Sequence, residues 1–170
     1  WEGGWNAAIG WLQLAVVLLG ILLVWVFYVS FVLRFTWLPT LEDTLVPFLI
    51  GLLEFAMIDL MHPEFLGPWF LLLACVYAVS VASSHMTMRR ARQDPANEYF
   101  FRGFAPANWR DYIVSAITVF VLVALGMTQW IIGDNPLISV IALSLALMAL
   151  LYQLYKAKFY WMHSLTANSK

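Results

Sequence analysis

The sequence predicts an all-α integral membrane protein, a bundle of five transmembrane helices with short loops, N-terminus outside and C-terminus inside. Of its 170 residues, 63% are hydrophobic and 11% are charged, and the mean hydropathy is +0.81. A soluble domain carries about 25% charged residues, so these side chains are too few to give a soluble fold a polar surface. The composition therefore excludes a cytosolic enzyme, a soluble nucleic-acid-binding protein and a disordered regulator.

Five apolar segments supply the expected spans. A helix needs roughly 20 apolar residues to cross a bilayer core of about 30 Å. We expect spans at residues 11–33, 46–61, 69–84, 112–132 and 137–162. The second span is short, and Pro47 suits its first turn, where a missing N–H costs nothing. The lone cysteine, Cys75, lies inside the third apolar run and is expected to be a small core residue.

The connecting segments indicate antiparallel neighbours and no soluble domain, so residues 1–170 form a single bundle. Residues 62–68 and 133–136 are short, and the second of these is a tight turn by composition. Residues 85–111 form the one longer connector, which is polar at first, breaks at Pro95 and continues with aromatic residues among charges. We expect its second part to lie in the membrane interface.

The basic residues provide an independent prediction of topology. Positive residues gather on the cytoplasmic side of a membrane, and five spans put every basic residue on one side. A four-span arrangement would divide them between the two sides. We therefore expect the 85–111 connector to be cytoplasmic, in the cell's inner or plasma membrane. The nine basic residues are Arg34, Arg89, Arg90, Arg92, Arg102, Arg110, Lys156, Lys158 and Lys170.

Glu54 is the first candidate functional residue. It lies near the middle of the second predicted span, and a carboxylate at the bilayer centre costs on the order of 2.5–3.5 kcal/mol on insertion scales. Its side chain must therefore face protein or water, or be protonated. One interpretation is a site for proton or cation passage. The other is a protonated acid that hydrogen-bonds a neighbouring helix as an anchor.

A polar cluster is expected at the outer end of the same span. Asp59 and His62 are three residues apart and share a helix face, and Glu64 follows closely. Two carboxylates and one imidazole are too few for a closed zinc site, so the alternatives are a proton entry point and a polar helix end. Asp59 is rotated by about 140° from Glu54, so this helix does not carry a continuous relay.

The arginines of the long connector are candidates for lipid or partner contact: Arg89, Arg90, Arg92, Arg102 and Arg110. Nearby acids offset them, and no nucleic-acid module surrounds them, so no nucleic-acid partner is expected. His85 and His163 fall at a common depth, as axial haem ligation requires, but no further motif indicates haem or another cofactor. Alanines at four-residue spacing, Ala74, Ala78, Ala82 and Ala142, Ala146, predict close helix packing.

No catalytic motif is present in the sequence, so an enzyme is the least favoured class. Two functional hypotheses follow. In the first, the protein is a homo-oligomeric, channel-like or sensor protein in which Glu54, with Asp59, serves proton or cation passage. In the second, it is a non-catalytic structural or sensory subunit of a larger membrane complex that docks through the arginine-rich connector.

Overall fold

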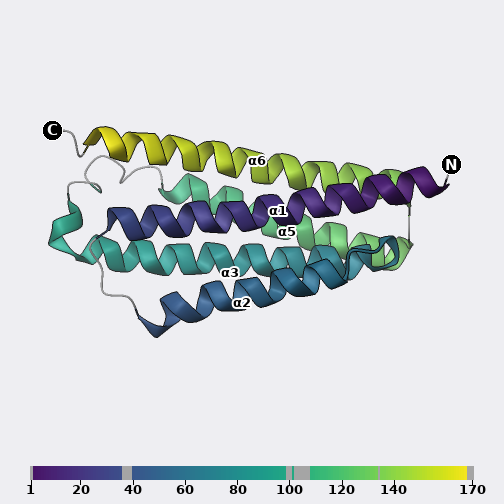
Figure 1. Ribbon diagram of the computed structural model, residues 1–170, viewed down its shortest axis with the longest axis horizontal. Helices are drawn as coiled ribbons and strands as arrows, with labels where there is room; N and C mark the ends of the chain where they lie inside the picture. Colours follow the sequence, from purple (N-terminus) through teal and green to yellow (C-terminus); the bar gives the residue numbers. More distant parts are fainter. Residues whose placement is uncertain (1, 36–39, 99–100, 102–107, 134, 168–170) are drawn as a thin grey trace.

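The described part of the chain forms a bundle of five long helices. A computed structural model describes residues 2–35, 40–98, 101, 108–133 and 135–167. The helices are α1 (Glu2–Arg34), α2 (Leu41–Asp59), α3 (Leu66–Gln93), α5 (Asn108–Ile132) and α6 (Pro136–Ala167), with 3₁₀ turns η1 (Pro63–Phe65) and η2 (Pro95–Asn97). The long helices lie side by side, and each runs opposite to the one before it, so α1, α3 and α6 share one direction (Figure 1).

Among the described residues, four helical segments are long and apolar enough to cross a membrane: Gly3–Ser30, Pro63–Gln93, Ile113–Ile132 and Pro136–Lys158. They correspond to the first, third, fourth and fifth predicted spans and indicate a membrane protein. The second predicted span corresponds to α2. It lies alongside the others (Figure 1) but is not among the four apolar segments. The four acids of its sequence explain this difference: Glu42, Asp43, Glu54 and Asp59.

The polarity of α2 is inverted relative to that of a helix on a soluble protein. Most of its exposed side chains are large and apolar, and six of them recur at helical spacing along one face: Leu41, Leu45, Phe48, Leu49, Leu52 and Phe55. Its buried side includes the carboxylate of Asp43 together with Ile50 and Met57. A helix on a soluble protein does the opposite, with its apolar stripe toward the core.

The start of α2 differs from the prediction. The helix begins at Leu41 because Thr40 and Asp43 form a capping box, in which the Thr40 backbone N–H donates to Asp43 Oδ2 at 2.7 Å. Such a cap satisfies N–H groups that the first turn leaves without helical partners. As a consequence, Pro47 lies inside the helix rather than in its first turn.

The long connector is also more helical than predicted. Helix α3 continues to Gln93, because the residues after Ser84 include good helix formers such as Met, Arg and Gln. The predicted break at Pro95 is confirmed, since Asp94 caps the 3₁₀ turn η2 there through its side chain. The predicted tight turn before α6 is confirmed by Gly133, whose φ of 80° lies in the left-handed region that favours glycine.

Helix pairs α3–α5 and α1–α6 are the most extensively packed, and α2 packs mainly on α3. Two glycines bring the backbones of α3 and α5 into contact: a Cβ atom on Gly67 would lie 3.1 Å from the backbone nitrogen of Trp130 and 3.2 Å from the carbonyl oxygen of Gly126. Of the predicted alanine stripes, Ala142 and Ala146 are buried on α6, whereas Ala82 on α3 is exposed.

One apolar core joins all five helices. Its largest fully buried side chains include Trp69 and Phe70 on α3, Met57 on α2 and Leu143 on α6. Cys75 is exposed and is not a core residue, contrary to the prediction. The reason is its position about 200° around α3 from the buried Leu73.

Candidate functional site

Glu54 is a half-buried acid on the inward side of α2. It lies 11 residues after Asp43, which corresponds to three helical turns plus about 20°, so the two acids share a face. Its Oε1 atom is buried and has no hydrogen-bond partner in the described part of the chain. Because α2 begins earlier than predicted, Glu54 lies beyond the middle of the helix, between residue 50 and the Asp59 end.

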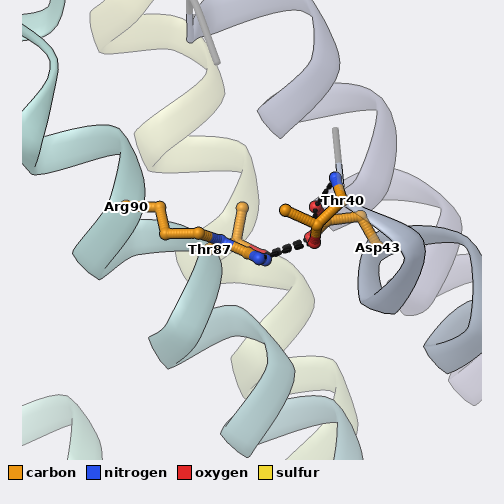
Figure 2. A network of polar contacts seen from close by, with 4 residues as sticks. All are labelled: Thr40, Asp43, Thr87 and Arg90. Carbon is orange, nitrogen blue, oxygen red and sulfur yellow. Dashed lines mark hydrogen bonds and ion pairs between the residues drawn. The ribbon is translucent and has the colours of Figure 1, made fainter. Parts of the chain in front are cut away.

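The other acid on this face, Asp43, belongs to a polar network between α2 and α3 (Figure 2). Arg90 Nη2 lies 2.5 Å from Asp43 Oδ1, and Arg90 Nη1 donates to Thr40 Oγ1 at 2.6 Å. Thr87 Oγ1 donates to Asp43 Oδ1 at 3.4 Å, and Thr40 Oγ1 donates to Asp43 Oδ2 at 2.8 Å. Both carboxylate oxygens of Asp43 are therefore hydrogen-bonded.

Because the Asp43 carboxylate is buried, its charge depends on this network. The side chain of Asp43 is 6% exposed and that of Arg90 is 29% exposed. A buried charge is tolerated when it is paired and hydrogen-bonded, and removing one partner leaves the other uncompensated. From the sequence, Arg90 was expected to lie in the cytoplasmic connector and to contact lipid or a partner, and Asp43 was not singled out. The pattern Thr40-x-x-Asp43 resembles a capping box and was a usable signal for Asp43.

Gln13 on α1 is a second polar residue that the sequence analysis did not select. Its side chain is fully buried beside Val16, and neither its amide nitrogen nor its amide oxygen has a hydrogen-bond partner among the described residues. Leaving a buried polar group unpaired costs about 1–3 kcal/mol. Native proteins keep such groups mostly where water, an ion or a functional role compensates the cost.

Two further polar contacts link helices. Gln153 on α6 donates to the hydroxyl oxygen of Tyr77 on α3 at 2.6 Å, and Gln129 on α5 donates to Ser139 on α6 at 3.2 Å. The Oε1 atom of Gln129 has no hydrogen-bond partner in the described ranges. Three of the described residues therefore have a buried side-chain oxygen without a hydrogen-bond partner: Gln13, Glu54 and Gln129.

The predicted outer polar cluster is exposed. Asp59, His62 and Glu64 lie at the α2–η1 connection and are open to the surroundings, and the His62 ring lies 6.3 Å from that of Phe65. Within the described residues, no group of three or more His, Cys, Asp or Glu side chains is arranged to hold a metal ion. Glu54 faces the bundle while Asp59 is exposed, so the two predicted pathway acids are not brought together.

The predicted arginine surface is divided between different environments. Arg89 and Arg92 are exposed, and the guanidinium carbon of Arg92 lies 5.2 Å from the centre of the Phe101 ring. Arg90 is committed to Asp43. Arg102 lies outside the described residues, as does the side chain of Arg110.

Of the two histidines expected at a common depth, only the side chain of His85 is described. His85 is exposed on α3, and the side chain of His163 lies outside the described residues.

Comparison of the chain with protein-family models, with curated proteins and with solved structures found no match.

Proposed function

We propose that this chain is a five-span membrane protein in which Glu54 forms part of a path for protons or monovalent cations. The observation that carries the proposal is the buried, unpartnered carboxyl oxygen of Glu54 on the inward face of α2. Acids within a membrane are costly and in general mark ion or proton pathways.

The inverted polarity of α2 supports its inclusion as the fifth span. Its exposed side includes Phe48, Leu52 and Phe55, each at least half exposed. Lipid is a favourable environment for such a surface, whereas water is not. The acids Asp43 and Glu54 lie on the other face, where intramembrane charges are normally found.

The distribution of charge supports the orientation with the N-terminus outside. The described basic residues of α3 and α6 lie toward the end of the bundle at which the chain ends, opposite the N-terminus (Figure 1). Lys and Arg favour the cytoplasmic side, so this end is assigned to the cytoplasm, with the membrane the cell's inner or plasma membrane.

An anchoring role for Glu54 has less support. An anchor requires a hydrogen bond from the carboxyl group to a neighbouring helix, and the described residues provide none to Glu54 Oε1. The fully buried Gln13 adds a second unpartnered polar group on α1, which contacts α2. Because Glu54 lies on the inward face, the proposed path runs within one chain, and the homo-oligomer expected from the sequence is not required for it.

Reconstituted protein tests this function directly. Liposomes carrying the wild type should conduct protons or a monovalent cation, and Glu54→Gln should reduce the flux at least tenfold. Glu64→Gln is the matched control, because Glu64 is an exposed acid in the turn η1 and does not share the inward face of α2, and it should conduct as the wild type does. Equal flux from Glu54→Gln and the wild type would refute the role of Glu54.

The second hypothesis, a structural or sensory subunit of a larger complex, is favoured by the exposed Arg89 and Arg92 near the end of α3. Both side chains are exposed and can therefore meet acidic lipid headgroups or an acidic partner. Absence of flux from well-folded wild-type protein would favour this role. Loss of a co-purifying partner on Arg89→Gln with Arg92→Gln would then support it.

A further inference from the structure

We propose that the first turns of α2 form an inner gate, in which the Asp43–Arg90 pair is the latch and Pro47 is the hinge. The gate would close the route between Glu54 and the basic end of the bundle. This inference rests on the proposed function, since it describes the regulation of the Glu54 path.

The latch is the polar link that holds the start of α2 against α3. Arg90 and Thr87 lie three residues apart on the same side of α3 and both contact Asp43, while Thr40 contacts both charged partners (Figure 2). Arg90 is 29% exposed, so its guanidinium can exchange Asp43 for water. A pair of this kind can open without leaving a fully buried charge on the arginine.

Pro47 separates the latch from the rest of the helix. Proline has no N–H, so position 47 cannot donate the helical hydrogen bond to the carbonyl group of Asp43, four residues earlier. A proline inside a helix is also the commonest cause of a kink. The segment from Leu41 to Val46 can therefore tilt at Pro47 without breaking the hydrogen bonds of the later turns.

The far end of α2 is held in place independently. Trp69 Nε1 donates to the carbonyl oxygen of Met57 at 3.1 Å, and both side chains are buried. Release of the Asp43 end would therefore move the first turns and leave the turn that carries Glu54 against α3.

The residues between latch and acid close the route in this structure. Asp43 and Glu54 share a face of α2 about 16 Å apart along the axis. On the same side lie Val46, Ile50 and Leu53, which pack into the apolar core. Of these three residues only Val46 lies before Pro47, so movement of the first turns would withdraw Val46 and shorten the apolar barrier between Glu54 and the cytoplasmic end to Ile50 and Leu53.

Flux from liposomes, measured on full-length variants, tests the gate. Arg90→Gln and Asp43→Asn should each raise proton or cation flux about fivefold or more, and adding Glu54→Gln to either should abolish the gain. The exchange Asp43→Arg with Arg90→Asp should return flux toward the wild-type value. Arg89→Gln is the matched control, since Arg89 is exposed on the next position, and it should leave flux unchanged.

A reversible lock keeps the test independent of folding defects. In a Cys75→Ser background, Asp43→Cys with Thr87→Cys places one thiol on each side of the contact between α2 and α3, where Thr87 Oγ1 and Asp43 Oδ1 are 3.4 Å apart, and formation of the disulfide on oxidation is verified first by thiol titration. Oxidised protein should be closed, and reduction of the same sample should raise its flux. Glu54-dependent flux that is the same in wild type and latch variants, and in both redox states, would overturn the gate but leave the proposed function standing. No Glu54-dependent flux in any variant would overturn both.

Discussion

Trp69 on α3 donates its indole N–H to the backbone carbonyl oxygen of Met57 on α2 at 3.1 Å. Met57 lies in the last turn of α2, where helix carbonyl groups lack intrahelical partners. Trp69 is also fully buried. One side chain thus fills the core between α2 and α3 and completes the hydrogen bonding of the end of α2.

Trp69→Phe is therefore expected to destabilise the protein by about 1 kcal/mol, because it keeps most of the apolar contact but leaves the Met57 carbonyl group without its donor. Chemical unfolding in detergent micelles, followed by circular dichroism, measures the change. Trp25→Phe is the matched control, since Trp25 is 61% exposed, and it should have no measurable effect. Equal stability of the two variants would show that the hydrogen bond contributes little.

Gly67 tests the close approach of α3 and α5. A methyl group at this position would lie 3.1 Å from the backbone nitrogen of Trp130, and backbone atoms cannot move aside as a side chain can. Gly67→Ala should therefore cost about 1–3 kcal/mol through overpacking. Gly20→Ala on α1 meets nothing within 4 Å and should be neutral or stabilising, because alanine favours helix. Thermal unfolding of both variants in the same detergent decides between them.

Gln13 is expected to trade stability for function. Gln13→Leu replaces an unpartnered buried amide with an apolar side chain of similar size, so it should stabilise the protein by about 1 kcal/mol. If Gln13 serves the path, the same variant should conduct less. Replacing a residue that is kept for function commonly raises stability and lowers activity in this way.

Gln153→Leu is the comparison for Gln13. It removes the donor to the Tyr77 hydroxyl oxygen, so it should destabilise where Gln13→Leu stabilises. The measurements are unfolding in detergent and flux in liposomes for both variants. A Gln13→Leu protein that is less stable than wild type would mean that its amide makes favourable interactions in the membrane.

Hydropathy predicts the helices correctly wherever an apolar run is long. Four predicted spans correspond to apolar helices of membrane-spanning length, because about 20 apolar residues are needed whatever their partners. The predicted start of α2, at residue 46, was wrong because the helix begins with polar residues, including Asp43, that are not part of the apolar run. The predicted end of α3, at residue 84, was wrong because the helix continues through Arg90, which was expected to lie in the connector.

The polar contacts could not be predicted in the same way. Asp43 and Arg90 are 47 residues apart, and their contact depends on how α2 packs against α3. Gln13 is a single polar residue in an apolar run, and its burial depends on neighbours from other helices. Glu54 could be selected from the sequence because its depth alone makes it costly. Whether it had a hydrogen-bond partner required the three-dimensional arrangement.

The central claim is that α2 crosses the bilayer and holds Glu54 within it. Single cysteines at Gly4 and His62, both exposed, test this claim in a Cys75→Ser background. Arg89→Cys is the reference for the opposite side. Five spans put Gly4 and His62 on the same side of the membrane, whereas a bundle in which α2 does not cross puts them on opposite sides.

The measurement is labelling of intact cells with a membrane-impermeant maleimide, before and after permeabilisation. We predict that the cysteines at positions 4 and 62 are labelled in intact cells and that the cysteine at position 89 is labelled only after permeabilisation. Labelling of positions 4 and 62 from opposite sides would contradict the account, because Glu54 would then not lie in a membrane span.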